Sequence, residues 1–137
     1  MAKAEQPVRI LIIDDEEAIR ESMQMFLEDL GYDVRTAADP VSCPVYCKGH
    51  CQQSERCADV IFVDQTMPKM SGLEFLQLQA ARGCKLAPQC KMLMTGDLTE
   101  RLYHQAQELG CHVEQKPVRL DRVVEFILTA QKVLYPE

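Results

Sequence analysis

The stretch of sequence that indicates the fold most directly is Val8-Arg9-Ile10-Leu11-Ile12-Ile13-Asp14-Asp15. Its first six residues are mostly apolar and β-branched, which is typical of a strand buried on both faces of a parallel sheet. The apolar run stops at two aspartates. In a parallel sheet the residues that follow a strand lie at its carboxyl edge, where such folds bind their ligands. This stretch therefore predicts a central strand with acidic side chains at one edge of the sheet.

Similar apolar runs alternate with amphipathic segments along the rest of the chain. The expected strands are 8–13, 33–37, 60–63, 92–94 and 111–115, and the expected helices are 16–30, 71–82, 98–109 and 120–134. Gly31 and Gly110 follow two of these helices, as glycine often does just past a helix end. Whether the cysteine-rich segment 40–58 forms a fifth helix stays open. The alternation predicts an α/β fold with a doubly wound five-stranded parallel sheet and helices on both faces.

Length and composition exclude several classes of protein. The chain has 137 residues, 47% of them apolar and 26% charged, which suits one globular domain with its own core. Its apolar runs are far shorter than the roughly 20 residues of a membrane-spanning helix, and the first residues lack the apolar core of a signal peptide. A net charge of −6 disfavours binding to nucleic acid. We therefore expect a cytoplasmic domain that contacts neither membranes nor nucleic acid.

Five polar residues stand at the ends of expected strands: Asp14, Asp15, Asp64, Thr95 and Lys116. Each alone is more typical of a cap, a turn or a solvated charge, but parallel strands would bring all five to one edge of the sheet. Three carboxylates at close range repel one another unless a cation joins them, and an all-oxygen ligand set favours Mg²⁺. A lysine and a hydroxyl beside that cation suit the oxygens of a phosphoryl group. The residues by themselves predict a Mg²⁺-dependent phosphoryl site with an aspartate acceptor.

Four short motifs carry a resemblance to a known family. They are Ile12-Ile13-Asp14-Asp15, Val63-Asp64-Gln65-Thr66-Met67-Pro68-Lys69-Met70-Ser71-Gly72, Met94-Thr95-Gly96 and Lys116-Pro117. Together they resemble the response-regulator receiver domain of two-component signalling, and the chain is similar to the single-domain chemotaxis regulator from Val8 to about Leu134. The resemblance implies a flavodoxin-like strand order 2-1-3-4-5, one receiver domain over 1–137 with its core at 8–134, and a cis Lys116–Pro117 bond.

The resemblance also implies which residues accept the phosphoryl group and bind the metal. Asp64 would be the phosphoacceptor. Asp15 and Asp64 would bind Mg²⁺ directly, Asp14 would bind it through water, and Thr66 would contribute its backbone carbonyl. A sensor histidine kinase or a histidine phosphotransfer protein would supply the phosphoryl group, and a downstream protein would be the target.

Thr95 and Lys116 would bind the phosphoryl group in the active form. The resemblance thus implies a phosphorylation-dependent response regulator and not an enzyme. A phosphatase of the haloacid-dehalogenase type would need a second acid two residues after Asp64, where this chain has Thr66. Because no output domain follows Leu134 in this sequence, we expect a single-domain regulator, a phosphate-relay intermediate or a domain cut from a longer protein.

Two positions depart from the family pattern. Val113 stands three residues before Lys116, where the family usually has an aromatic residue, and the segment 110–116 is one residue short. Rotation of an aromatic ring at that position therefore cannot couple phosphorylation to output. Gln65 stands where the family usually has an apolar residue. These departures leave the phosphorylation chemistry unchanged but leave the mode of switching open.

The cysteine-rich segment 40–58 stands in place of the family's usual second helix. It carries Cys43, Cys47, Cys51 and Cys57 in the spacing C-x3-C-x3-C-x5-C. In a helix the first three would share one face, so the four thiolates could hold Zn²⁺ or an iron–sulfur cluster. A metal- or redox-sensing receiver-like domain is therefore the alternative function. The same spacing also suits a helix that packs cysteines into the core, or a disulfide.

Overall fold

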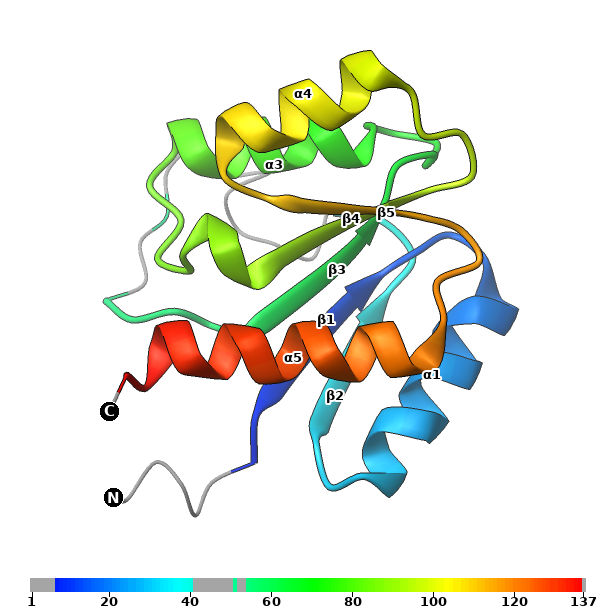
Figure 1. The fold of residues 1–137 in the computed structure, drawn as a ribbon, viewed down its shortest axis with the longest axis vertical. Helices are drawn as coiled ribbons and strands as arrows, with labels where there is room; N and C mark the ends of the chain where they lie inside the picture. Colours follow the sequence, from blue (N-terminus) through cyan, green and yellow to red (C-terminus); the bar gives the residue numbers. More distant parts are fainter. Residues whose placement is uncertain (1–6, 41–50, 52–53, 137) are drawn as a thin grey trace.

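The structure, a computed structural model, describes residues 7–40, 51 and 54–136 (Figure 1). Its strands are β1 (Arg9–Ile13), β2 (Asp33–Ala37), β3 (Val60–Asp64), β4 (Lys91–Thr95) and β5 (His112–Gln115). Its α-helices are α1 (Glu17–Asp29), α3 (Gly72–Ala81), α4 (Glu100–Leu109) and α5 (Leu120–Leu134), and a short 3₁₀ helix, η3 (Pro88–Cys90), precedes β4. Every strand and helix that the sequence clearly predicted is present, with ends shifted by at most two residues.

The strands form one parallel sheet in the order β2-β1-β3-β4-β5, which confirms the predicted doubly wound, flavodoxin-like topology. Helices α1 and α5 cover one face of the sheet, and α3 and α4 cover the other (Figure 1). The register places Asp64 beside Met94 and Thr95 beside Gln115. The last residues of neighbouring strands therefore lie together at one edge of the sheet, which we call the carboxyl edge.

The central strands and the helices packed on them form the core. All residues of β3 and β4 are buried, as expected for strands covered on both faces. Phe62 of β3 meets Phe126 of α5 edge-on, with ring centroids 5.7 Å apart, and Phe75 of α3 is also buried. Each large buried side chain of this kind contributes about 1.5–3 kcal/mol. This packing fixes the strand ends that carry the acidic residues.

The start of α3 is held close to the end of β3. Ser71 Oγ accepts a hydrogen bond from the Glu74 N–H at 3.1 Å, and the Glu74 carboxylate accepts one from the Ser71 N–H at 3.0 Å, forming a capping box. A Cβ at Gly72 would lie only 2.5 Å from the Asp64 carbonyl oxygen. Glycine is therefore needed where α3 approaches the strand that carries Asp64.

Three smaller predictions can be compared with the structure. The Lys116–Pro117 bond is cis, as the resemblance implied. Gly31 and Gly110 have positive φ angles of 97° and 83°, which confirms their expected place just past helix ends. Among the described residues, no helix is both long enough and apolar enough to cross a membrane.

The cysteine-rich segment falls largely outside the described residues, which exclude Cys43 and Cys47. Cys51 is half-buried, and its backbone N–H donates to the Arg82 carbonyl at 2.8 Å. Cys57 is exposed. The metal site formed by these cysteines therefore stays a sequence-based prediction, as does the single domain over residues 1–137.

Candidate functional site

Three carboxylates meet at the carboxyl edge of the sheet. Asp14 and Asp15 follow β1, and Asp64 is the last residue of β3. One oxygen from each lies within 4.8 Å of the others. Asp14 and Asp64 are buried, whereas Asp15 is exposed. The structure thus confirms that these three predicted residues converge, and it leaves the site open to solvent on the side of Asp15.

Lys116, which follows β5, is the cation at this edge. Its Nζ lies 3.0 Å from Asp14 Oδ2 and 2.9 Å from Asp64 Oδ1, and Glu16 Oε1 lies 3.6 Å away. One ammonium therefore faces four carboxylates when Asp15 is counted. Glu16 is not among the site residues predicted from the sequence, although its position directly after the two aspartates was a signal that it would lie near them.

The charges at this edge are not balanced by the protein alone. Burial raises the pKa of Asp64, and the charge of Asp14 raises it further, while the hydrogen bond from Lys116 opposes the rise. Burial would lower the pKa of Lys116, but its bonds to Asp64 and Asp14 raise it overall. The lysine thus stays charged and is shared between two carboxylates. A set of carboxylate oxygens with excess negative charge is the donor set that suits Mg²⁺.

The two oxygens of Asp14 already have protein partners. Oδ1 accepts a hydrogen bond from the Glu16 N–H at 2.9 Å, and Oδ2 accepts one from Lys116 Nζ. Arg20 also donates to the Asp14 backbone carbonyl at 2.7 Å, which fixes the turn between β1 and α1. Asp14 is therefore a buried, oriented group, and Asp15 is the more accessible of the two aspartates.

Thr95, the last residue of β4, lies buried at the same edge. Its Oγ1 accepts a hydrogen bond from the Asp97 N–H at 3.1 Å. Its carbonyl accepts one from the Lys116 N–H at 2.6 Å. A backbone hydrogen bond thus joins Thr95 to Lys116, the two residues predicted to bind the phosphoryl group. A shift of the Thr95 backbone would therefore also shift the backbone of Lys116.

The residues after Asp64 explain one departure from the family pattern. Gln65 Oε1 accepts a hydrogen bond from the Leu73 N–H at 2.8 Å, and the Gln65 carbonyl accepts one from the Gly72 N–H at 3.0 Å. A polar residue fits this position because it binds the first turn of α3. Thr66 is exposed, and its backbone N–H donates to the Asp64 carboxylate, which tends to lower the pKa of that group.

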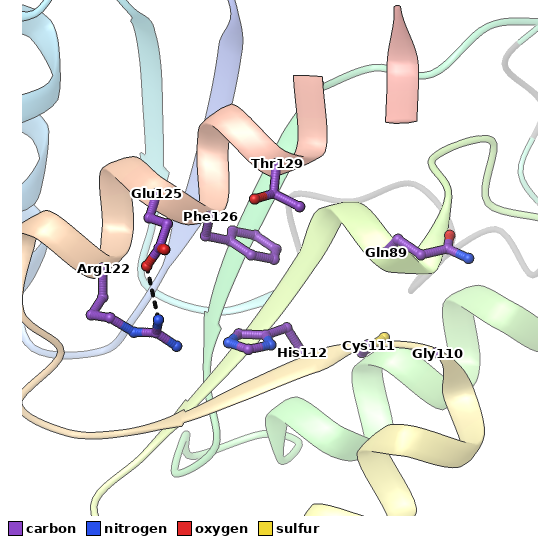
Figure 2. A pocket seen from close by; sticks show the side chains of 8 residues that line it. All are labelled: Gln89, Gly110, Cys111, His112, Arg122, Glu125, Phe126 and Thr129. Atoms are coloured by element: carbon purple, nitrogen blue, oxygen red, sulfur yellow. Dashed lines mark hydrogen bonds and ion pairs between the residues drawn. The ribbon is translucent and has the colours of Figure 1, made fainter. Parts of the chain in front are cut away.

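A hollow of about 380 Å³ lies between α5 and the start of β5 (Figure 2). There the His112 ring stacks on Phe126, with centroids 5.4 Å apart, and His112 Nε2 lies 2.7 Å from Glu114 Oε2. Arg122 donates to both Glu114 and Glu125. Burial would raise the pKa of Glu114, but its bonds to His112 and Arg122 lower it. These contacts tie β5 to α5 and anchor the strand.

The structure is an α/β domain whose parallel sheet, in the order 2-1-3-4-5, carries three carboxylates and a lysine at its carboxyl edge. The family model described as "Response regulator receiver domain" matches residues 10–127. The chain therefore belongs to the response regulator receiver domain family.

Relatives of known function are similar to this chain over most of its length. The response regulator Rre1 of Synechocystis is 29% identical over 133 residues, which are 93% of this chain and 54% of Rre1. The peroxide stress-activated histidine kinase mak3 of Schizosaccharomyces pombe is 30% identical over 125 residues, which are 88% of this chain and 5% of mak3. The chain thus spans about half of the first relative and a small part of the second.

Solved structures agree with the fold. The beryllofluoride-activated NtrC4 receiver domain dimer is 26% identical, with a TM-score of 0.70 over 89% of this chain and 94% of that one. The chemotaxis protein CheY4 of Vibrio cholerae is 24% identical, with a TM-score of 0.72 over 91% and 99% of the two chains. The second likeness concerns the fold alone.

Proposed function

We propose that this chain is a phosphorylation-dependent response regulator whose phosphoacceptor is Asp64. The observation that carries the proposal is the position of Lys116, whose ammonium bridges Asp14 and Asp64 at 3.0 and 2.9 Å. The Asp64 carboxylate thus lies at the end of β3 with the Lys116 ammonium beside it. The carboxylates of Asp14 and Asp15 lie close enough to bind a metal ion with it. Family membership supports the same function.

In the proposed reaction, a carboxylate oxygen of Asp64 attacks the phosphorus of a phosphohistidine on a histidine kinase or phosphotransfer protein. A phosphorus–oxygen bond forms and the phosphorus–nitrogen bond breaks. The bonding electron pair stays on the imidazole, which takes up a proton. The side chains of Asp14, Asp15 and Asp64, with the Thr66 carbonyl, would hold Mg²⁺, which neutralises charge on the phosphoryl oxygens when it is bound.

The chain's own residues then stabilise the product. Lys116 can exchange its contact with Asp64 for a phosphoryl oxygen while it keeps its hydrogen bond to Asp14. The buried Thr95 hydroxyl would donate to a second phosphoryl oxygen, on the side of β4. These contacts exist only in the phosphorylated state, so they supply the differential binding energy that a switch needs. We expect the regulator to act in the cytoplasm on a downstream protein, without turning over a substrate.

The alternative of a metal- or redox-sensing domain has no observation in its favour. Within the part of the chain that the structure describes, the group of side chains placed to hold a metal is Asp14, Asp15 and Asp64. Two of the four cysteines behind this alternative, Cys43 and Cys47, lie outside that part.

The proposal is tested by incubating the protein with acetyl phosphate and measuring its intact mass. The wild type should gain one phosphoryl group with Mg²⁺ and almost none with chelator. Asp64→Asn should gain none, whereas Asp29→Asn, which changes an exposed acid at the end of α1, should label like the wild type. Full labelling of Asp64→Asn would contradict the proposal.

A further inference from the structure

Gln115, the last residue of β5, makes an unusual pair of contacts with the loop that follows β4. Its Nε2 donates to the Gly96 carbonyl at 2.7 Å, and its Oε1 accepts a hydrogen bond from the Leu98 N–H at 2.9 Å. The partners fix the orientation of the amide, because a carbonyl needs a donor and an N–H needs an acceptor. The side chain thus binds the backbone of residues 96–98 much as a neighbouring strand would.

These contacts hold the loop that carries Thr95. Gln115 lies beside Thr95 in the sheet, and the next residue, Lys116, donates its N–H to the Thr95 carbonyl at 2.6 Å. The Thr95 hydroxyl accepts the Asp97 N–H. Residues 95–98 are therefore joined to the end of β5 at three points, and the Gln115 side chain supplies two of them.

Strand β5 offers the loop a firm anchor. Val113 is buried in the core, and His112 and Glu114 are joined to α5 by the ring stack and the charged contacts with Arg122. Val113 is apolar and has no hydrogen bond to offer the loop. A shift of the Thr95 loop is therefore resisted by the amide of Gln115 and not by an aromatic ring.

We propose that Gln115 is a latch that holds residues 96–98 in the resting position and is released when Asp64 is phosphorylated. The proposal rests on the function proposed above. Movement of the Thr95 hydroxyl toward a phosphoryl oxygen would pull the backbone of Gly96 and Asp97 with it. That movement would stretch the two hydrogen bonds from Gln115 to Gly96 and Leu98. Both hydrogen bonds are exposed, so each contributes little to stability. Losing the pair should shift the equilibrium from the resting toward the released position by about fivefold, which is a small effect for two hydrogen bonds.

The latch itself is tested in the resting protein by the solvent exchange of the Leu98 amide, measured by NMR. Gln115→Ala should speed this exchange about fivefold, because Leu98 loses its acceptor. Gln115→Glu keeps an acceptor for Leu98 but loses the donor to Gly96, so it should give an intermediate rate. Gln24→Ala changes a half-buried glutamine of α1 whose exposed hydrogen bond goes to Glu28, and it should leave the Leu98 exchange rate unchanged. Equal rates in the wild type and Gln115→Ala would overturn the latch.

Release is tested with beryllofluoride and Mg²⁺, which imitate the phosphoryl group. The Leu98 exchange of the wild type should rise to the rate of Gln115→Ala, which should itself change little. Because coupling is reciprocal, Gln115→Ala should also bind beryllofluoride about fivefold more tightly. A wild-type Leu98 amide that stays protected with beryllofluoride bound would overturn release while leaving phosphorylation intact. Absence of acetyl phosphate labelling at Asp64 would instead contradict the proposed function.

Discussion

Two buried aspartates lie at the two ends of β3 and have opposite surroundings: Asp64 ends the strand at the carboxyl edge, and Asp59 precedes it at the opposite edge, which we call the amino edge. At the carboxyl edge, Asp64 shares one lysine with Asp14. At the amino edge, Asp59 lies between two arginines: Arg9 donates its backbone N–H at 2.8 Å and its side chain at 3.2 and 3.3 Å, and Arg56 Nε donates at 2.8 Å. Asp64 therefore shares its cation with other carboxylates, whereas Asp59 contacts two cations.

Burial does not explain the contrast, because Asp59 is 2% exposed and Asp64 is 4% exposed. Burial tends to raise the pKa of both. At Asp59 the hydrogen bonds from Arg9 and Arg56 overcome that effect and lower the pKa. At Asp64 the pKa is raised, because the nearby charge of Asp14 adds to burial. The different neighbours of Asp59 and Asp64 therefore move the pKa values of these two buried carboxyl groups in opposite directions.

The largest effect on stability is expected at the amino edge. Asp59→Asn should lower the free energy of unfolding by about 3 kcal/mol, because the buried carboxylate loses its charge-assisted hydrogen bonds to Arg9 and Arg56. Chemical denaturation would measure this loss. The variant should still label with acetyl phosphate at a temperature where it is folded, because Asp59 lies at the opposite edge from Asp64. Loss of labelling in folded Asp59→Asn would contradict the inference that Asp59 stabilises the fold without taking part in phosphorylation.

Gly72→Ala should have the next largest effect. The new Cβ would lie 2.5 Å from both the Asp64 carbonyl oxygen and Leu93 Cδ1, and relief of such overlap typically costs about 1–3 kcal/mol. Because the strain falls on the residue that carries the acceptor, labelling should also slow. The matched control is Gly96→Ala, since a Cβ there meets nothing within 4 Å. Equal unfolding curves for the two variants would contradict the close approach of α3.

The third prediction concerns pH. Because the pKa of Asp59 is lower in the folded protein than in the unfolded chain, its ionised form stabilises the fold above the unfolded pKa of about 3.9. That contribution is lost as the pH falls toward the folded value. The stability difference between the wild type and Asp59→Asn should therefore narrow by about 1 kcal/mol between pH 6 and pH 3. A difference that is constant or grows in acid would show that Asp59 is not stabilised as a carboxylate.

The smallest effect is expected for Asp64→Asn. Removing one of several buried like charges should raise the free energy of unfolding without Mg²⁺, by less than about 1 kcal/mol, because the loss of the Lys116 contact offsets part of the gain. The same denaturation experiment measures it. A loss of stability comparable to that of Asp59→Asn would mean that Asp64 is a structural acid after all.

The sequence predicted the features that depend on local pattern. The buried strands and the residues that follow them could be recognised from hydrophobic runs, and parallel topology then brought Asp14, Asp15 and Asp64 together. The family resemblance supplied the strand order. Helix η3 was missed because three residues are too few to show a helical period.

Contacts that depend on register could not be predicted in the same way. Arg9 and Asp59 lie 50 residues apart in sequence, and Gln115 lies 17 residues from Leu98. Only the pairing of β1 with β3 and of β4 with β5 brings these residues to their partners. Glu16 is an intermediate case, since its neighbours were recognised but its reach toward Lys116 was not.

Asp64 is the proposed phosphoacceptor, and the most direct test of this assignment is to locate the label. The wild type would be treated with acetyl phosphate and Mg²⁺ and then with borohydride, which reduces an aspartyl phosphate to homoserine. Peptide mapping should find homoserine at position 64 and should lose it when Mg²⁺ is chelated. Homoserine at position 14, 15 or 59 instead, or none at position 64, would contradict the account.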